Sequence, residues 1–148
     1  MTDQPYSGYI SGGAHRFAIR VYYEDTDAGG IVYHANYLRF MERARTDMLA
    51  HCGIDLGRAL AAGEGTYVVV ATSLRFRAPA KLGDGLLLIS RMTELRGSSC
   101  VIHQTVSRDG LQLVDASVTV AFVGLDGRPR RKPAAWIEAF RAVTELDD

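Results

Sequence analysis

Four residues near the start of the chain carry groups that could do chemistry: the carboxylates Glu24, Asp25 and Asp27, and the histidine His34. Such groups could bind a divalent metal, or act as nucleophile, acid or base in catalysis. Aspartate between a strand and a helix is also, and most often, a turn former or a helix cap. The surrounding residues must therefore decide between a turn, a metal site and a reactive site.

A metal site is the interpretation that the spacing favours least. Adjacent residues of a strand point to opposite faces, so Glu24 and Asp25 cannot easily bind one metal together. An EF-hand loop would supply roughly six oxygen ligands within about twelve residues, and that pattern is not present here. We therefore expect no metal and no cofactor.

Two glycines favour the reactive site. Gly29 and Gly30 have no Cβ, so the backbone here can lie close to a ligand. A helix that begins near residues 33–36 would add unpaired N–H groups and the positive end of its dipole. Asp27 could then attack a carbonyl carbon or activate water, while the helix N–H groups bind the developing oxyanion. His34 could orient the substrate or stabilise charge, although an isolated histidine is usually structural.

The elements that must position these residues follow from the apolar pattern. Alternation over residues 15–23 predicts a half-buried strand, and apolar residues at steps of three and four over 36–52 predict an amphipathic helix. A second short helix is expected at 55–62, and Pro133 opens a terminal helix. Further strands are predicted at 67–77, 86–95, 99–107 and 111–123. Short glycine-containing turns make the later strands antiparallel neighbours, so we predict an α+β fold with one long helix against a curled antiparallel sheet.

Composition indicates one globular domain. The 148 residues suit a single core, and 17 basic with 17 acidic residues leave no net charge, so we expect no nucleic acid partner. Cys52 and Cys100 form no CxxC pair, which favours a reducing cytoplasm. No apolar run is long enough to span a membrane. Residues 1–14 lack the features of a signal peptide, and we expect a flexible tail there.

The run RVYYEDTDAGGIVYHANYLRFMERARTDML, residues 20–49, resembles the hot-dog-fold acyl-CoA thioesterases of the 4-hydroxybenzoyl-CoA thioesterase family. Within that family it is similar to the YbgC-type branch associated with the Tol–Pal system. FRAPAKLGD at 76–84 and RGSS at 96–99 resemble the same branch. The resemblance implies a hot-dog domain over residues 15–132, with five antiparallel strands wrapped around one long helix. The C-terminal helix, residues 133–148, would pack on the same domain.

The resemblance also assigns roles to the motif. It implies that Asp27 is the catalytic carboxylate, that the backbone N–H of His34 is the oxyanion donor, and that Glu42 faces the site from the helix. The 4-hydroxybenzoyl-specific enzymes carry a proline and a non-histidine where this chain has Ala28 and His34. We therefore expect a short-chain or other aliphatic acyl group.

Contacts to the rest of the substrate are expected at two places. The basic run GRPRRK, residues 127–132, is either a solvated loop or an anion site for the phosphates of coenzyme A. The turn at residues 97–99 is either a plain hairpin or part of a pantetheine channel. The expected binding residues are Gly29, Gly30, Tyr33, Asn36, Gly97, Ser98, Ser99, Arg128, Arg130 and Arg131.

From these observations we expect a thioester hydrolase for acyl-CoA or an acyl-carrier-protein thioester, with coenzyme A as part of the substrate. The resemblance implies a homo-oligomer, dimer or tetramer, whose sites lie at the subunit interface. It also implies a link to the Tol–Pal envelope system, and a cytoplasmic or inner-membrane-peripheral location. The alternatives are a hot-dog enoyl-thioester hydratase or dehydratase, and a non-catalytic module that binds acyl thioesters or envelope partners.

Overall fold

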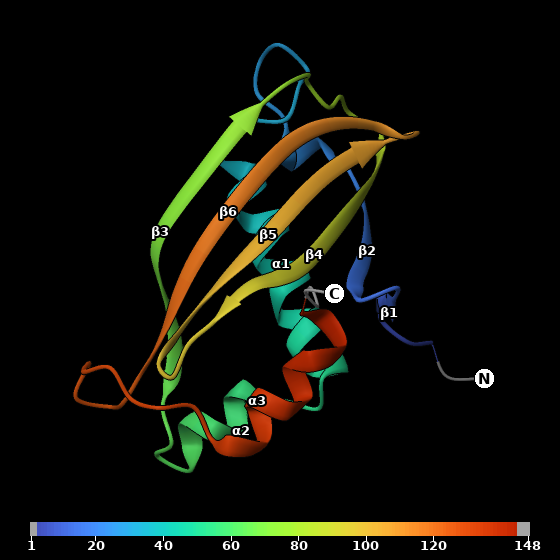
Figure 1. Ribbon diagram of the computed structural model, residues 1–148. Helices are drawn as coiled ribbons and strands as arrows, with labels where there is room; N and C mark the ends of the chain where they lie inside the picture. The colour runs from blue at the N-terminus through green and yellow to red at the C-terminus, as the bar shows by residue number, and fades with distance from the viewer. Residues whose placement is uncertain (1–2, 145–148) are drawn as a thin grey trace.

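The computed structural model describes residues 3–144 (Figure 1). In chain order the elements are β1 (Tyr9–Ser11), β2 (Ala14–Arg20), the 3-10 helix η1 (Tyr23–Asp25), α1 (Asn36–His51), α2 (Leu56–Ala61), β3 (Thr66–Phe76), β4 (Gly85–Leu95), β5 (Ser99–Arg108), β6 (Leu111–Val123), α3 (Ala134–Ala139) and the 3-10 helix η2 (Phe140–Val143). None of the helices in this part of the chain has the length and apolar character needed to cross a membrane.

The strands form one antiparallel sheet in the order β1-β2-β4-β5-β6-β3. Figure 1 shows the sheet curling around α1, with α2 and α3 gathered at its lower end. This is the hot-dog arrangement that the sequence predicts. The loop between β2 and α1 lies at the opposite, upper end, beside the link between β3 and β4.

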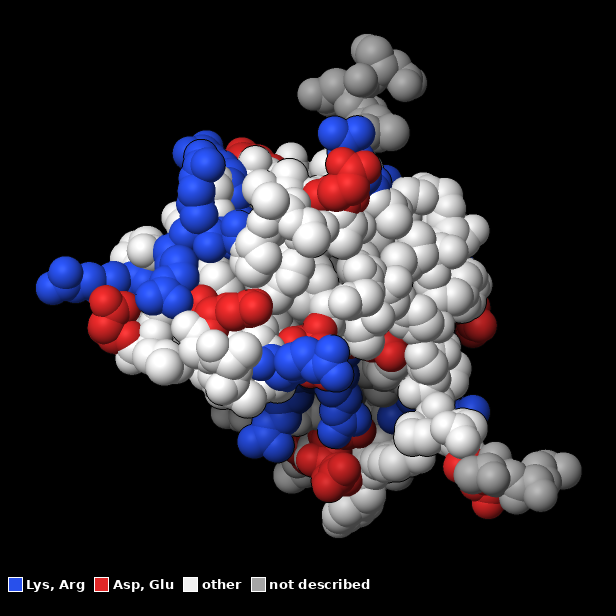
Figure 2. Space-filling view, turned by 90° about the horizontal axis from the view of Figure 1, so that it is seen from below, with Lys and Arg blue, Asp and Glu red and all other residues white. Residues whose placement is uncertain are grey.

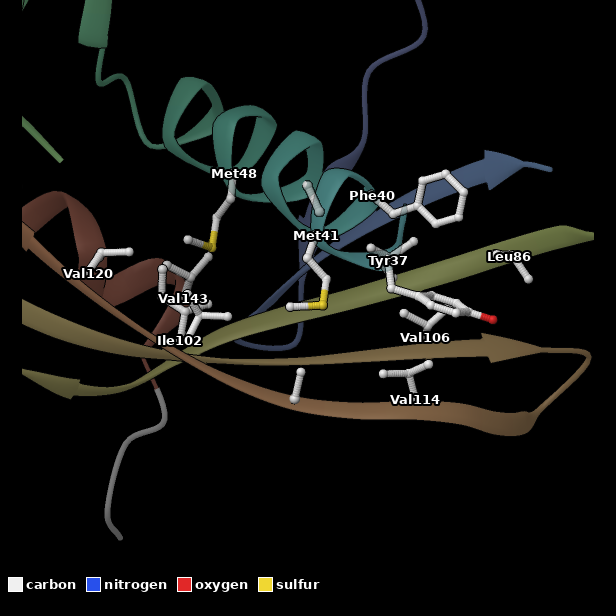
Figure 3. Packing of buried hydrophobic residues seen from close by; sticks show 14 of the residues in the cluster. Tyr37, Phe40, Met41, Met48, Leu86, Ile102, Val106, Val114, Val120 and Val143 are labelled. Carbon is white, nitrogen blue, oxygen red and sulfur yellow. The ribbon is translucent and has the colours of Figure 1, made fainter. Parts of the chain in front are cut away.

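The core lies between α1 and the concave face of the sheet. The helix residues Phe40, Met41, Ala44 and Met48 are at most 1% exposed. In Figure 3, Met41 and Met48 point from α1 towards the apolar side chains of the sheet. Burial of each such side chain contributes roughly 1.5–3 kcal/mol. The amphipathic pattern of the helix is therefore the main determinant of its place in the fold.

Four details differ from the sequence-based expectation. The C-terminal helix expected over residues 133–148 is the shorter α3, followed by η2, and residues 145–148 lie outside the described part of the chain. The sheet has six strands among residues 3–144 rather than five, because β1 pairs with β2. Residues 9–11 therefore form a strand where we expected a flexible tail. The strand predicted at 15–23 ends at Arg20, because the side chain of Asp25 accepts a hydrogen bond from the N–H of Tyr22 and turns the chain into η1.

Candidate active site

The loop that carries Asp27 is fixed by its backbone. Thr26 and Val32 form an isolated antiparallel bridge, and the N–H of Asp27 donates to the carbonyl of Ile31 at 2.9 Å. Gly30 closes the turn with a φ of 78°, a conformation that favours glycine, and its N–H donates to the carbonyl of Asp27. The carboxylate of Asp27 accepts from the N–H of Gly29 at 2.8 Å and is otherwise exposed. The structure therefore holds an accessible carboxylate on a rigid turn.

Asp25, two residues earlier, is buried and has a different role. One carboxylate oxygen accepts from the side-chain amide of Asn36, and the other accepts from the N–H of Tyr22, both at 2.8 Å. Its carbonyl accepts from the N–H of Tyr33. Because Asn36 is the first residue of α1, Asp25 joins the Asp27 loop to the start of the helix. The sequence interpretation of Asp25 as a turn residue missed this role, since no spacing rule links residues 25 and 36.

His34 lies two residues before the start of α1, over an open apolar groove. The groove is lined by Ile31, Val32, His34, Tyr37, Phe76 and Pro79, among others. The His34 ring lies 4.5 Å from the ring of Tyr33 and 6.4 Å from that of Phe76, measured between centroids. Within residues 3–144 the His34 N–H has no hydrogen-bond acceptor, whereas the N–H groups of Tyr33 and Asn36 are both paired. A free N–H beside a helix N-terminus is a suitable donor for an oxyanion.

Glu42 lies farther along α1 and does not line the His34 groove. It is exposed and borders a small cavity between α1 and β3, together with Arg45, Tyr67 and Val69. Burial lowers the pKa of Arg45, and the nearby charge of Glu42 opposes that shift. Arg45 donates to the buried side chain of Gln104, so Arg45, and not the exposed Glu42, belongs to the hydrogen-bonded polar group beneath the middle of the helix.

The cavity beside Glu42 is mostly apolar, with a volume of about 90 Å³. Leu49, Met92, Ile102, Val120 and Phe140 form its apolar wall. The hydroxyl of Tyr67 is buried without a hydrogen-bond partner among the described residues, and burial raises its pKa. Burial likewise raises the pKa of the Cys100 thiol to about 11, so this thiol is protonated near neutral pH.

The turn at residues 97–99 and the basic run lie together at the lower end of the sheet. The Arg131 side chain packs against Gly97, and Arg130 donates to the carbonyls of Gly63 and Glu64 at 3.0 Å. Arg128 is exposed; its backbone N–H donates to the carboxylate of Asp126 and its carbonyl accepts from the N–H of Gly124, while its guanidinium group has no hydrogen-bond partner among residues 3–144. Figure 2, which views this end, shows basic side chains interspersed with acidic ones rather than one continuous positive face.

Lys132, which the sequence analysis did not single out, is the buried member of this run. It is 4% exposed, and its ammonium group donates to the carbonyls of Arg96 at 2.6 Å and Ser99 at 3.0 Å. Burial lowers the pKa of its ammonium group. The lysine therefore fixes the β4–β5 turn from below. Lys132 follows three exposed arginines in the same basic run, so the sequence does not indicate that it alone is buried.

In one chain, the two groups of candidate residues lie at opposite ends of the sheet (Figure 1). Asp27, Gly29, Gly30, Tyr33, His34 and Asn36 share the upper loop, while residues 97–99 and Arg128, Arg130 and Arg131 share the lower end. Glu42 lies between them on α1.

Known proteins match this chain over most of its length. A family profile described as the thioesterase superfamily matches residues 29–114. The Escherichia coli acyl-CoA thioester hydrolase YbgC is 42% identical over 128 residues, which cover 85% of this chain and 95% of that protein. The Haemophilus influenzae acyl-CoA thioesterase YbgC is 39% identical and covers 86% and 91%, respectively.

Solved structures agree with the fold. A probable thioesterase from Bartonella henselae superposes with a TM-score of 0.78 at 35% identity, over 81% of this chain and 99% of that one. A 4-hydroxybenzoyl-CoA thioesterase bound to 4-hydroxybenzoyl-CoA superposes with a TM-score of 0.81 over 87% and 99%, and at 24% identity it supports the fold alone. The chain belongs to the thioesterase superfamily and, within it, to the YbgC-type acyl-CoA thioesterases.

Proposed function

We propose that the protein hydrolyses the thioester of short aliphatic acyl-CoA, with Asp27 as nucleophile or general base. The observation that carries this proposal is the exposed Asp27 carboxylate on a rigid turn, close in the chain to the N–H of His34, which has no acceptor among residues 3–144. The relatives named as acyl-CoA thioester hydrolases support the substrate class.

The chemistry requires few groups. Asp27 attacks the carbonyl carbon, or takes a proton from a water that attacks it, and the carbonyl electron pair moves onto the oxygen. The His34 N–H and the dipole of α1 stabilise that oxyanion. When the tetrahedral intermediate collapses, the C–S bond breaks and coenzyme A leaves as a thiolate. With Asp27 as base, the free acid forms in this step; with Asp27 as nucleophile, an Asp27 acyl anhydride forms, and a water then cleaves it to the free acid and the regenerated carboxylate. Thiols have a pKa near 8.5, so departure needs no strong acid.

The site is completed by a second copy of the chain in this proposal. β3 is an edge strand whose residues 68–73 are exposed, and it carries Val68, Val69 and Val70 on its surface. Such an edge is a template for pairing with another strand. Antiparallel pairing of two β3 strands about their midpoint would place Phe76 of one chain opposite the partner's strand start, near the cavity beside Glu42. A dimer, or a tetramer built from two such dimers, follows.

The same geometry supports a role for each remaining candidate. The His34 groove of one chain would face the small cavity of the other, which becomes the acyl pocket. Its volume of about 90 Å³ is below the roughly 150 Å³ of an apolar cavity that holds benzene, which favours a short aliphatic acyl group. The partner's 97–99 turn and its exposed Arg128 and Arg131 would lie near the phosphates of coenzyme A, or of a carrier protein's phosphopantetheine.

A cytoplasmic location belongs to the proposal, since both cysteines are free thiols. A peripheral place at the inner membrane and a link to the Tol–Pal system rest on the family resemblance alone. Co-purification with Tol–Pal components from crosslinked cells would test that link separately from the activity.

Replacement of Asp27 by asparagine tests the proposed chemistry. Asn keeps an oxygen for the N–H of Gly29, and the other bonds of the turn are made by backbone atoms, so the fold should be unchanged. We expect kcat for a short-chain acyl-CoA to fall at least about 100-fold, because the nucleophile or base is lost. Thiol release gives the rate, and circular dichroism checks the fold. Activity within a few-fold of the parent protein would exclude this role of Asp27.

The same assay separates the two alternatives. A hydratase would add water to an enoyl thioester without releasing thiol, and a binding module would retain acyl-CoA without turnover. A hydrolysis panel over acyl lengths then identifies the substrate, with activity confined to the shorter acyl groups as the expected result.

Replacement of Ala71 by lysine tests the β3 interface. Residue 71 lies at the middle of β3, so the proposed pairing would place two lysines opposite each other. We expect the variant to sediment as a monomer and to lose activity. Ala18→Lys, on the exposed face of β2, is the matched control and should leave both properties unchanged. An active Ala71→Lys oligomer would contradict this mode of pairing.

A further inference from the structure

Three potential metal ligands meet at the C-terminal half of α1, away from the candidate active site. His15 comes from β2, while Asp47 and His51 are four residues apart on α1. The Nε2 atom of His15 lies 2.7 Å from Oδ2 of Asp47, and the Nε2 atom of His51 lies 3.4 Å from the same oxygen. One ligand atom from each residue falls within 4.8 Å of the others. Both imidazoles thus direct Nε2 at one carboxylate.

We propose that His15, Asp47 and His51 bind a divalent metal of the zinc class. Two imidazole nitrogens and one carboxylate oxygen are a common three-residue ligand set for zinc. Residues four apart on a helix share one face, which lets Asp47 and His51 bind one ion together. The proposal departs from our expectation of no metal, because the ligands come from separate segments and follow no recognised spacing.

The distances between the ligand atoms are close to those of a zinc site, so only a small rearrangement of the side chains is needed for binding. Bond lengths of about 2.0–2.1 Å place the ligand atoms of a tetrahedral zinc site about 3.3 Å apart. The 3.4 Å between Asp47 and His51 already matches this separation. The distance of 2.7 Å between His15 Nε2 and Asp47 Oδ2 must increase by about 0.6 Å. The hydrogen bond between these atoms is then replaced by one bond from each atom to the metal. Small rotations of Asp47 and His51 suffice, because His51 is about one-third exposed.

The N-terminal segment closes the site and offers a fourth oxygen. Ser7 Oγ lies 2.7 Å from His51 Nε2 and 3.3 Å from Asp47 Oδ1. The N–H of Gly8 donates to Asp47 Oδ2 at 2.9 Å, and a Cβ at residue 8 would overlap the carbonyl oxygen of Arg16. Ser7 or a water molecule would complete a tetrahedron. The ion would then clamp the N-terminal segment and β2 onto α1.

The surroundings of His15 limit the expected affinity for the metal. Its imidazole is fully buried, and Nδ1 has no hydrogen-bond partner among residues 3–144. Metal-binding histidines usually donate this second N–H to an acceptor, and loss of such a partner costs roughly 10–100-fold in affinity. We therefore expect a dissociation constant in the micromolar range, rather than the tighter binding of a fully supported zinc site.

The proposal can be tested by metal titration of the tag-free protein. The protein is first treated with a chelator and is then titrated with Zn²⁺ and, separately, with Co²⁺. We expect one equivalent to bind by calorimetry, visible absorption of tetrahedral Co²⁺, and a higher melting temperature with Zn²⁺. His51→Ala, at a partly exposed position, and Asp47→Asn should each weaken binding at least ten-fold. His103→Ala is the matched control, since His103 lies 2.7 Å from Asp115 without a third ligand, and it should bind as the parent does.

Two results would overturn the proposal. One is no saturable binding of either metal up to millimolar concentration. The other is equal affinity in the parent protein and the His51→Ala variant, which would place the metal elsewhere. Neither result depends on thioester hydrolysis, so the activity of the enzyme and this site are tested separately.

Discussion

The two ends of the curved sheet use their charged side chains in opposite ways. At the upper end, backbone hydrogen bonds hold the turn of residues 26–32, so the Asp27 carboxylate has only one local hydrogen bond and stays exposed. At the lower end, the long basic side chains hold the chain together. Arg130 and Lys132 donate to carbonyl oxygens of neighbouring loops, and Lys132 is buried in doing so.

This difference separates reactive groups from structural ones. A side chain whose turn is held by other atoms remains free for a ligand, as Asp27 does. A side chain that satisfies buried carbonyls cannot leave them without cost. The basic run is therefore not one anion site: Arg128 and Arg131 remain candidates for phosphate, while Lys132 maintains the turn they surround. At the upper end, Asp25 has the corresponding structural role.

Among the variants that alter structural side chains, Asp25→Asn should have the largest effect, because it breaks that support. The new amide must face either the Asn36 amide or the Tyr22 N–H, so two donors oppose each other. We expect a loss of about 1–3 kcal/mol in the free energy of unfolding. We also expect kcat to fall roughly 10–100-fold, because the helix start moves relative to Asp27. Denaturant unfolding and thiol release measure the two quantities.

A paired swap provides the control for Asp25. In Asp25→Asn with Asn36→Asp, the residue 25 amide can donate to the new carboxylate while its oxygen still accepts from Tyr22. The double variant should recover most of the lost stability, and with it the activity. If the swap restores stability but leaves kcat as low as in the single variant, Asp25 affects the reaction by something other than positioning.

Lys132→Met should have the next largest effect, on stability alone. Its buried ammonium group donates to the carbonyls of Arg96 and Ser99, and loss of these charge-assisted hydrogen bonds should cost about 1–3 kcal/mol, although the Ser99 carbonyl still accepts from the Arg96 N–H. kcat of the folded variant should stay near that of the parent.

Arg128→Met is the contrasting variant. Its free energy of unfolding should be unchanged, while KM for acyl-CoA rises roughly three- to ten-fold if Arg128 binds phosphate. Equal stability losses in both variants would remove the distinction between the two side chains.

Apolar periodicity was sufficient to predict most of the fold. The helix predicted at 36–52 is α1, and the last four predicted strands agree with β3 to β6 within one residue at each end. These elements bury regular faces, so their period is visible along the chain. β1 has only three residues, too few for a period, and its pairing with β2 depends on a turn through Gly12 and Gly13.

The candidate site was predicted less completely, because its support is non-local. Sequence and resemblance indicated Asp27, the glycines and His34, all within one short motif. The carboxylate that joins this motif to α1 is Asp25, and its partner Asn36 lies eleven residues away. Which of two nearby aspartates is buried depends on how η1 turns the chain, and side-chain type does not encode that.

The smallest expected effect concerns the β3–β4 link, which braces the Asp27 loop through the bridge between Lys81 and Ile31. Asp84 accepts from the Lys81 N–H and from Arg108, and these hydrogen bonds lower the pKa of its carboxyl. A lowered folded pKa contributes stability above the unfolded value, near 3.8, and that contribution is lost as the pH falls through the folded pKa.

Asp84→Asn should therefore lower the melting temperature by about 1–3 °C at pH 6, since partly exposed ion pairs contribute little. The gap between the variant and the parent should begin to close as the pH falls below about 3.8 and close further as the pH passes the lower folded pKa, because the carboxyl is then protonated in both the folded and the unfolded parent. Thermal unfolding from pH 6 to pH 2.5 measures it. A gap that persists at the lowest pH would show that Asp84 acts through its shape and hydrogen bonds rather than its charge, and that the brace of the Asp27 loop does not depend on ionisation.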